Sequence, residues 1–141
     1  MISIDPGKAG AIVRWKNSLP MSIQNLPYEG GKLDIDLMDQ YLLQSEIVIV
    51  EDVHTSPRMG VVSAGSFMYN LGVIHALSID KNLIKLPPKR WKNVMGLYGK
   101  PKDHALKIVE RLMPDVYEQL VKPFSNRVDR AEAILNMGSV S

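Results

Sequence analysis

The sequence predicts an α/β fold, a mixed five-stranded sheet with helices on both faces. Two short runs rich in β-branched residues, at residues 2–5 and 47–51, each end in an acid and run into a loop. Four longer segments repeat apolar side chains at helical spacing. Segments typical of strands come first and then alternate with segments typical of helices, which is the order expected of a sheet covered by helices.

Length and composition limit the class of protein. The 141 residues are expected to form one domain, 1–141, that is long enough to bury a core. No apolar run approaches the roughly 18 residues of a membrane span, and no signal-peptide pattern is present. The absence of Cys excludes a disulfide framework and a thiolate metal site. We therefore expect a soluble cytoplasmic protein with no membrane partner.

The first half of the chain is expected to hold four strands and two helices. A turn from Pro6 to Gly10 separates the first two strands, and a third strand flanked by prolines is expected at a sheet edge. Residues 28–31 and 54–65 are expected to be loops. The expected elements are strands at 2–5, 9–15, 21–26 and 47–51, and helices at 33–42 and 66–79.

The second half is expected to add one strand and two helices. A fifth strand at 83–86 is stopped by Pro87 and Pro88, and a helical turn follows with Trp91 in the core. Pro101 lies where the first position of a helix ending near residue 112 is expected, and Pro114 is expected to end that helix. A last helix is expected at 126–137.

Four acids are the candidate catalytic and metal-binding residues. Asp5 and Glu51 end the two β-branched strands, and the ends of neighbouring parallel strands lie about 5 Å apart. Asp129 and Glu132 project from nearly one side of the last helix, because they are three positions apart. Clustered carboxylates repel one another and favour hard divalent cations, Mg²⁺ or Mn²⁺. Two such ions can activate a water and stabilise the leaving oxygen of a phosphodiester.

Each half of this set also has a simpler interpretation. Asp5, Pro6 and Gly7 together are a common turn sequence. The last helix carries Arg127 and Arg130 beside its acids, so its charges are also consistent with a solvent face of ion pairs.

Positive charge is concentrated in the second part of the chain. Residues 1–80 contain five Lys/Arg and nine Asp/Glu, a net charge of −4, whereas residues 81–141 contain twelve and six, a net charge of +6. Residues 81–102 contain seven basic residues and no acid. This stretch is either a solvated face or a surface that contacts phosphates.

Three motifs resemble those of the RuvC Holliday junction resolvases. The run Ile-Ser-Ile-Asp-Pro-Gly at residues 2–7 is similar to their first acidic motif, and Ile-Val-Ile-Val-Glu-Asp-Val-His at 47–54 to their second. Asp-Arg-Ala-Glu-Ala at 129–133 resembles their closing motif. Lys-Arg-Trp-Lys at 89–92, with Leu-Met-Pro at 112–114, is similar to the phage-encoded branch. The resemblance spans essentially the whole chain.

The resemblance implies a ribonuclease H-like fold, a homodimer and paired symmetric nicking of four-way DNA junctions. It makes Asp5, Glu51, Asp129 and Glu132 the ligands of two Mg²⁺ ions per site, with Mn²⁺ able to substitute. It also implies the cytoplasm of a bacterial cell or of a phage-infected host. Glu132 is one methylene longer than the Asp usual in the bacterial enzymes.

Basic and aromatic residues supply the candidates for contact with branched DNA. The basic candidates are Arg58, Lys89, Arg90, Lys92, Lys100, Lys102, Lys122 and Arg127. The candidates for a wedge inserted into an opened junction are Met59, Phe67 and Tyr69, although core packing is the favoured role for Phe67.

Two other functions fit the same residues. One is a ribonuclease H-like nuclease that acts on other branched DNA or on structured RNA. The other is a non-catalytic junction-binding module, against which the intact set of four acids argues.

Overall fold

A mixed five-stranded sheet forms the centre of the molecule. The structure, a computed structural model, describes residues 1–138. The strand order is β3-β2-β1-β6-β7, in which β1 pairs antiparallel with β2 and parallel with β6. The strands are β1 (Ile2–Asp5), β2 (Ala11–Lys16), β3 (Leu19–Asn25), β6 (Ile47–Glu51) and β7 (Asn82–Leu86). All five lie close to their predicted positions, and β3 is an edge strand as predicted.

Side chains along the two central strands, β1 and β6, alternate between the two faces of the sheet. Ile2 and Ile4 of β1 lie in one buried cluster together with Val48 and Val50 of β6, whereas Ile49 lies in the other. Because successive side chains of a strand point to opposite faces, Asp5 and Glu51 share the face of Ile49.

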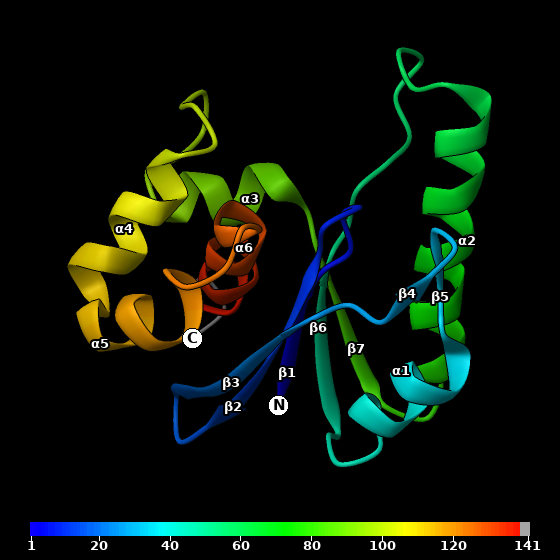
Figure 1. The fold of residues 1–141 in the computed structure, drawn as a ribbon, viewed down its shortest axis with the longest axis horizontal. Coiled ribbons are helices and arrows are strands. Elements are labelled where there is room, and N and C mark those ends of the chain that lie inside the picture. Colours follow the sequence, from blue (N-terminus) through cyan, green and yellow to red (C-terminus); the bar gives the residue numbers. More distant parts are fainter. Residues whose placement is uncertain (139–141) are drawn as a thin grey trace.

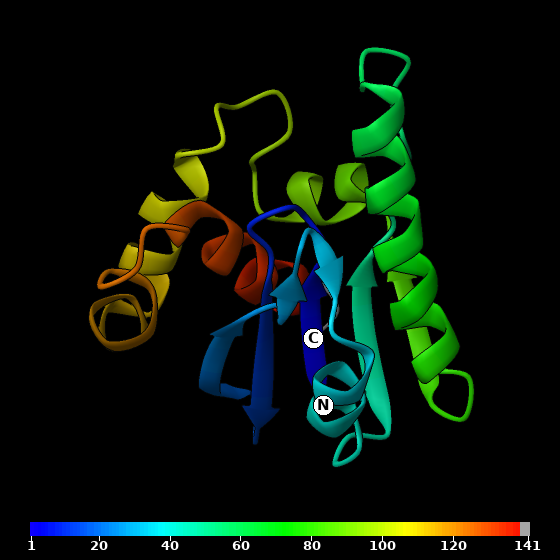
Figure 2. The same ribbon diagram turned by 45° about the vertical axis from the view of Figure 1, so that its right-hand side comes forward.

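Helices cover both faces of the sheet, as predicted (Figure 1). One face carries α1 (Ile35–Leu42), α2 (Val61–Leu77) and a hairpin of β4 (Tyr28–Glu29) and β5 (Lys32–Leu33). The other carries α3 (Pro88–Val94), α4 (His104–Leu112), α5 (Pro114–Val116), η1 (Tyr117–Val121) and α6 (Arg127–Gly138). The strands β1 and β6 point the same way, towards α3 and the loops above the sheet (Figure 2).

Three sequence-based expectations about these elements are wrong. Residues 28–31 are not a loop but enter the β4–β5 hairpin, where Gly30 and Gly31 have φ of 60° and 81° and allow the reversal. Leu33 belongs to β5 rather than to α1, which begins after Asp34, whose side chain caps the helix by accepting a hydrogen bond from the Leu37 N–H. The long helix α2 begins at Val61 instead of residue 66.

Pro114 follows the end of α4, as predicted, and it also starts a further helical segment, which was not predicted. The helix α4 ends at Leu112, and Pro114 then takes the first position of α5, where a missing N–H costs nothing. This segment continues as the π-helix η1 and packs against α4 and β3. Among residues 1–138, no helix combines the length and the apolar character needed to cross a membrane.

Candidate functional site

Two acids lie side by side at one edge of the sheet. In the parallel pair β1–β6, Ile4 is opposite Val50, so Asp5 and Glu51 end their strands as neighbours. Both are buried, with 4% of Asp5 and 7% of Glu51 exposed. A buried carboxylate is costly unless hydrogen bonds or cations compensate it, which marks this edge as a functional candidate.

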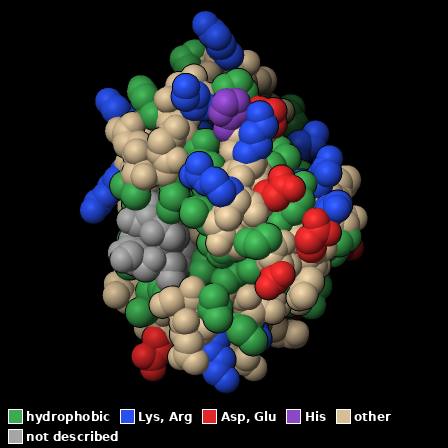
Figure 3. Space-filling model, turned by 90° about the vertical axis from the view of Figure 1, so that its left-hand side faces the viewer, with side chains coloured by type: hydrophobic (Ala, Val, Ile, Leu, Met, Phe, Trp, Pro, Cys, Tyr) green, Lys and Arg blue, Asp and Glu red, His purple; other side chains and the backbone are tan. Residues whose placement is uncertain are grey.

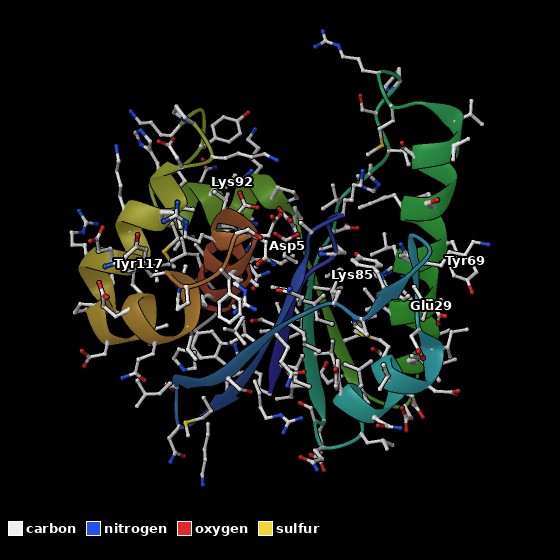
Figure 4. The ribbon with its side chains drawn as sticks, in the orientation of Figure 1. Asp5, Glu29, Tyr69, Lys85, Lys92 and Tyr117 are labelled. Atoms are coloured by element: carbon white, nitrogen blue, oxygen red, sulfur yellow. The ribbon has the colours of Figure 1, made fainter. Side chains whose placement is uncertain are left out.

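The helix α6 brings two further acids to the same edge. It is held against β1 by hydrogen bonds from Ser3 Oγ to the Ala133 carbonyl and from Asn136 Nδ2 to the Ile4 carbonyl, the latter at 3.2 Å. Carboxylate oxygens of Asp5, Asp129 and Glu132 consequently lie within 4.8 Å of one another. Figure 4 shows Asp5 at the end of the sheet next to α6. Glu51 is the strand-end neighbour of Asp5 but is not one of the three acids within 4.8 Å. We call Asp5, Glu51, Asp129 and Glu132 the acidic site.

The turn after β1 holds Asp5 in place. The Gly7 N–H donates to Asp5 Oδ1 at 3.0 Å, while Asp5 Oδ2 is buried and has no hydrogen-bond partner among the described residues. A side chain at Gly7 would place its Cβ 3.2 Å from Asp5 Oδ1 and 3.5 Å from Asp129 Oδ1. Glycine therefore keeps open the space in front of two of the carboxylates.

Glu51 is held by an aromatic donor. Trp91 of α3 is fully buried, and its Nε1–H donates to Glu51 Oε1 at 3.1 Å. Burial of Trp91 in the core is as predicted, but the hydrogen bond was not foreseen, because Trp91 and Glu51 are 40 positions apart in the chain.

Burial raises the pKa of every member of the acidic site, and repulsion between carboxylates adds to the rise at Asp5, Glu51 and Glu132. The pKa of Asp5 is raised well above its ordinary value, chiefly by burial and then by the charges of Glu51 and Glu132. Burial likewise raises the pKa of Glu51, Asp129 and Glu132. A divalent cation would relieve this repulsion, so the charge and the oxygen-only donors suit a hard ion.

Two lysines oppose this effect. The charges of Lys92 and Lys102 lower the pKa values of Glu51 and Glu132, and Lys102 also lowers the pKa of Asp129. Both lysines line a small pocket beside Glu132. From the sequence, both lysines were predicted only to contact DNA. In the structure they lie next to the acids of the acidic site.

The other predicted contact residues are exposed, and one of them, Lys100, lines the same small pocket as Glu132. Lys89, Arg90 and Lys100 are exposed on α3 and the loop after it, and Arg58 and Arg127 are exposed on the tip before α2 and at the start of α6. Lys122 is exposed and forms an ion pair with Glu118 at 3.1 Å.

The three wedge candidates differ in exposure. Phe67 packs against the core beneath α2, the role favoured for it from the sequence. Met59 and Tyr69 are 38% and 43% exposed, and the Lys32 ammonium lies 5.1 Å from the centre of the Tyr69 ring. Figure 4 shows Tyr69 pointing outward from α2.

Two further residues support the acidic site without having been predicted. The Tyr28 hydroxyl donates to the Gly7 carbonyl at 2.6 Å and ties the hairpin to the turn after Asp5. Arg130 is 2% exposed, donates to Asn25 Oδ1 at 2.9 Å and to the Leu120 carbonyl at 2.7 Å, and stacks on Phe124. Arg130 therefore fixes the start of α6 and does not belong to a solvent face of ion pairs.

Comparison with known proteins defines the fold. No family model and no curated protein matches the chain. The solved structure of RuvC from Thermus thermophilus matches with a TM-score of 0.64 and 16% identity, covering 99% of this chain and 94% of that one. The chain has the fold of RuvC. A second structure, T. thermophilus RuvC in complex with a Holliday junction substrate, matches with the same TM-score and 15% identity, covering 99% and 93% of the two chains. The expected ribonuclease H-like architecture is thus confirmed.

Proposed function

We propose that the protein is a metal-dependent, structure-selective DNA endonuclease that resolves four-way junctions by paired symmetric nicks. The observation that carries this proposal is the group of three carboxylates, Asp5, Asp129 and Glu132, within 4.8 Å at one sheet edge. The RuvC-like fold supports it, because a protein of that fold has been solved with a Holliday junction substrate. The basic surface beside the carboxylates supports it as well.

The residues present fit a divalent metal. All the metal-ligand atoms that the acidic site offers are carboxylate oxygens, and Oδ2 of Asp5 is buried with no fixed hydrogen-bond partner among residues 1–138. We assign Asp5, Glu51, Asp129 and Glu132 as the ligands of two Mg²⁺ ions, for which Mn²⁺ should substitute. When bound, such ions supply a water nucleophile at neutral pH and stabilise the leaving oxygen.

The chain's own residues orient the reaction. Gly7 and Trp91 each fix one oxygen of a buried carboxylate, so Asp5 and Glu51 cannot rotate freely. Lys92 and Lys102 bring positive charge to the place where a phosphodiester would add negative charge. In the proposed hydrolysis a water oxygen bonds to phosphorus while the bond to the 3′ oxygen breaks. The products are 5′-phosphate and 3′-hydroxyl ends, which a ligase can seal.

The basic surface around α3 and α4 is the proposed contact for the DNA backbone. Figure 3 shows Lys and Arg side chains gathered over the upper part of this face. Phosphates and not bases should be its targets, because ammonium and guanidinium groups on an exposed surface recognise charge. Two copies of the chain would supply the two nicks, since each copy presents one acidic site.

The decisive experiment is a cleavage assay on a mobile four-way junction with Mg²⁺, run beside flaps, forks, plain duplex and RNA hybrids. We expect Asp5→Asn, Glu51→Gln and Asp129→Asn each to abolish cleavage while junction binding stays near wild type. Glu132→Gln should have a smaller effect, because its longer arm can reach the site in more than one way. Asp36→Asn, an exposed acid of α1, is the matched control and should cleave normally.

The other outcomes identify the alternatives. Faster cleavage of flaps, forks or RNA hybrids than of junctions would make the protein a nuclease for other branched or structured nucleic acids. Junction binding without any Mg²⁺- or Mn²⁺-dependent cleavage would make it a binding module. Appreciable Mg²⁺-dependent cleavage by Asp5→Asn would refute the assignment of the acidic site.

A further inference from the structure

We infer that Trp91 is a positioning residue that orients Glu51 for metal binding, an inference that rests on the function proposed above. The indole Nε1–H donates to Glu51 Oε1 at 3.1 Å, and both partners are buried, with 0% of Trp91 and 7% of Glu51 exposed. Within residues 1–138 this indole is the hydrogen-bond donor that reaches the Glu51 carboxylate. Its single proton engages Oε1, so Oε2 receives no hydrogen bond from the indole.

A rigid framework sets the direction of this hydrogen bond. Trp91 lies in the short helix α3, directly after β7, and β7 pairs with β6 so that Leu86 is opposite Glu51. The indole packs in the same buried cluster as Leu86, Leu97 and Ala105. The acceptor therefore extends from β6 and the donor from the helix that directly follows its partner strand β7, and the indole cannot leave Glu51 without opening the core.

A neutral donor is the appropriate partner for a metal ligand. Lysine or arginine at this point would neutralise the carboxylate and compete with a cation for it, whereas an indole N–H fixes the oxygen and leaves the charge in place. Hydrogen bonds to metal-ligating carboxylates generally set their orientation, and loss of such a partner typically weakens metal binding or activity by about 10- to 100-fold.

Trp15 provides an internal comparison. It is 6% exposed, lies in the same buried cluster and donates its Nε1–H to Ser3 Oγ at 2.8 Å. Each tryptophan thus makes one buried hydrogen bond from its indole, but only that of Trp91 ends on an acid. Loss of either N–H should lower stability, and only loss of the Trp91 N–H should change metal binding.

The two-tryptophan composition also gives a direct signal. In Trp15→Phe protein Trp91 is the sole tryptophan, so its fluorescence reports on the hydrogen bond to Glu51. Titration with Mg²⁺ should change that emission at the same concentrations at which calorimetry detects binding. Glu51→Gln should remove the response.

The test compares Trp91→Phe with Trp15→Phe. Mn²⁺ and Mg²⁺ affinities are measured by calorimetry, and the junction-cleavage rate is measured as a function of Mg²⁺ concentration. We expect Trp91→Phe to weaken metal binding by about 10- to 100-fold and to shift the Mg²⁺ dependence of cleavage to higher concentration. Trp15→Phe should keep both within about twofold of wild type, although both variants melt earlier.

An isosteric analogue of tryptophan separates the loss of the N–H from a loss of stability. In the Trp15→Phe background, replacing the remaining tryptophan with 3-benzothienylalanine exchanges the N–H for sulfur and keeps the shape. The same loss of metal affinity is expected, with near-normal stability. Metal binding and cleavage equal to those of Trp15→Phe would overturn the inference and leave the proposed function standing. A wild-type protein that neither binds metal nor cleaves would overturn both.

Discussion

At the scale of single residues, the acidic site lowers the stability of the fold. Asp5 is buried, its Oδ2 has no partner among the described residues, and three other carboxylates surround it. The raised pKa of Asp5 expresses this cost, because burial and like charge both disfavour the ionised form. The same buried carboxylates that suit a cation therefore destabilise the folded protein when no cation is bound.

A pH dependence follows from this raised pKa. Between the ordinary pKa of an aspartate and the raised pKa of Asp5, the folded protein holds a proton that the unfolded chain has lost. The free energy of unfolding should therefore fall as the pH rises through this window. In EDTA, Asp5→Asn should be more stable than wild type at pH 8 by about 1 kcal/mol or more, with a smaller difference at pH 4. Urea denaturation at both pH values measures this difference, and a wild-type advantage at pH 8 would contradict it.

Gly10 is the second critical residue of the turn that carries Asp5. A Cβ at Gly10 would lie 2.1 Å from the Asp5 carbonyl oxygen and 2.7 Å from that of Gly7, distances that only backbone movement can relieve. We expect Gly10→Ala to lower the free energy of unfolding by about 3 kcal/mol.

Gly72 is the matched control for this substitution. It is exposed in the middle of α2, and a Cβ there would meet nothing within 4 Å. Gly72→Ala should raise stability by about 0.5–1 kcal/mol, because alanine loses less backbone entropy in a helix. Equal destabilisation by the two alanines, in denaturant titrations, would show that the turn tolerates a side chain.

At the scale of elements, the stretch from β7 to α4 combines two groups of basic residues. Lys92 and Lys102 lower the pKa values of the carboxylates, and Lys89, Arg90 and Lys100 are exposed on the same side, where we expect them to meet a DNA backbone. Lys81 lies at the other end of β7 and donates to the Ser45 carbonyl at 2.9 Å. The number of basic residues in the stretch 81–102 is therefore larger than the number expected to contact DNA.

Replacement of the exposed group tests its role. Alanine at Lys89, Arg90 or Lys100 should weaken binding to all junction sequences about equally and lower the log–log salt slope by roughly one per contact. The triple variant should lower the slope by about three while Mg²⁺ affinity stays unchanged. Lys81→Ala is the control that leaves the slope as it is. Binding isotherms at several salt concentrations give these slopes, and an unchanged slope in the triple variant would place the DNA surface elsewhere.

At the scale of the whole molecule, we propose that α2 is the surface that meets a second copy of the chain. Its exposed apolar side chains include Val61, Val62 and Met68, with exposed fractions of 90%, 83% and 49%. We expect sedimentation to detect a dimer at micromolar concentration, and Met68→Glu to shift it towards monomer by burying a charge in the interface. Lys107→Glu, on the exposed side of α4, should leave the assembly unchanged. Wild type that sediments only as monomer, with and without junction DNA, would contradict the dimer.

Local patterns predicted most of the sheet but few of the long-range contacts. The runs at 2–5 and 47–51 were placed correctly because β-branched residues and a terminal acid are visible within a few positions. The hairpin at 28–33 was missed because paired glycines suit both a loop and a reversal, and α5 because a proline both stops and starts helices. The four acids were selected from the sequence, and their roles stay a prediction.

The residues that support the acidic site could not be predicted from local sequence patterns. The hydrogen bond of Trp91 to Glu51 and the network of Arg130 join positions 40 and 105 apart in the chain. Their partners become neighbours only when the strands pair and α6 packs, so no local pattern contains them.

The attachment of α6 to β1 has a consequence for synthesis on the ribosome. The hydrogen bonds that hold α6 there, from Ser3 to Ala133 and from Asn136 to Ile4, join residues 130 and 132 positions apart. A nascent chain that has released all five strands holds Asp5 and Glu51 but not yet Asp129 and Glu132. The cluster that would take up metal is therefore complete only after translation has passed α6. The proposed nuclease activity would therefore be absent from a nascent chain until α6 has emerged.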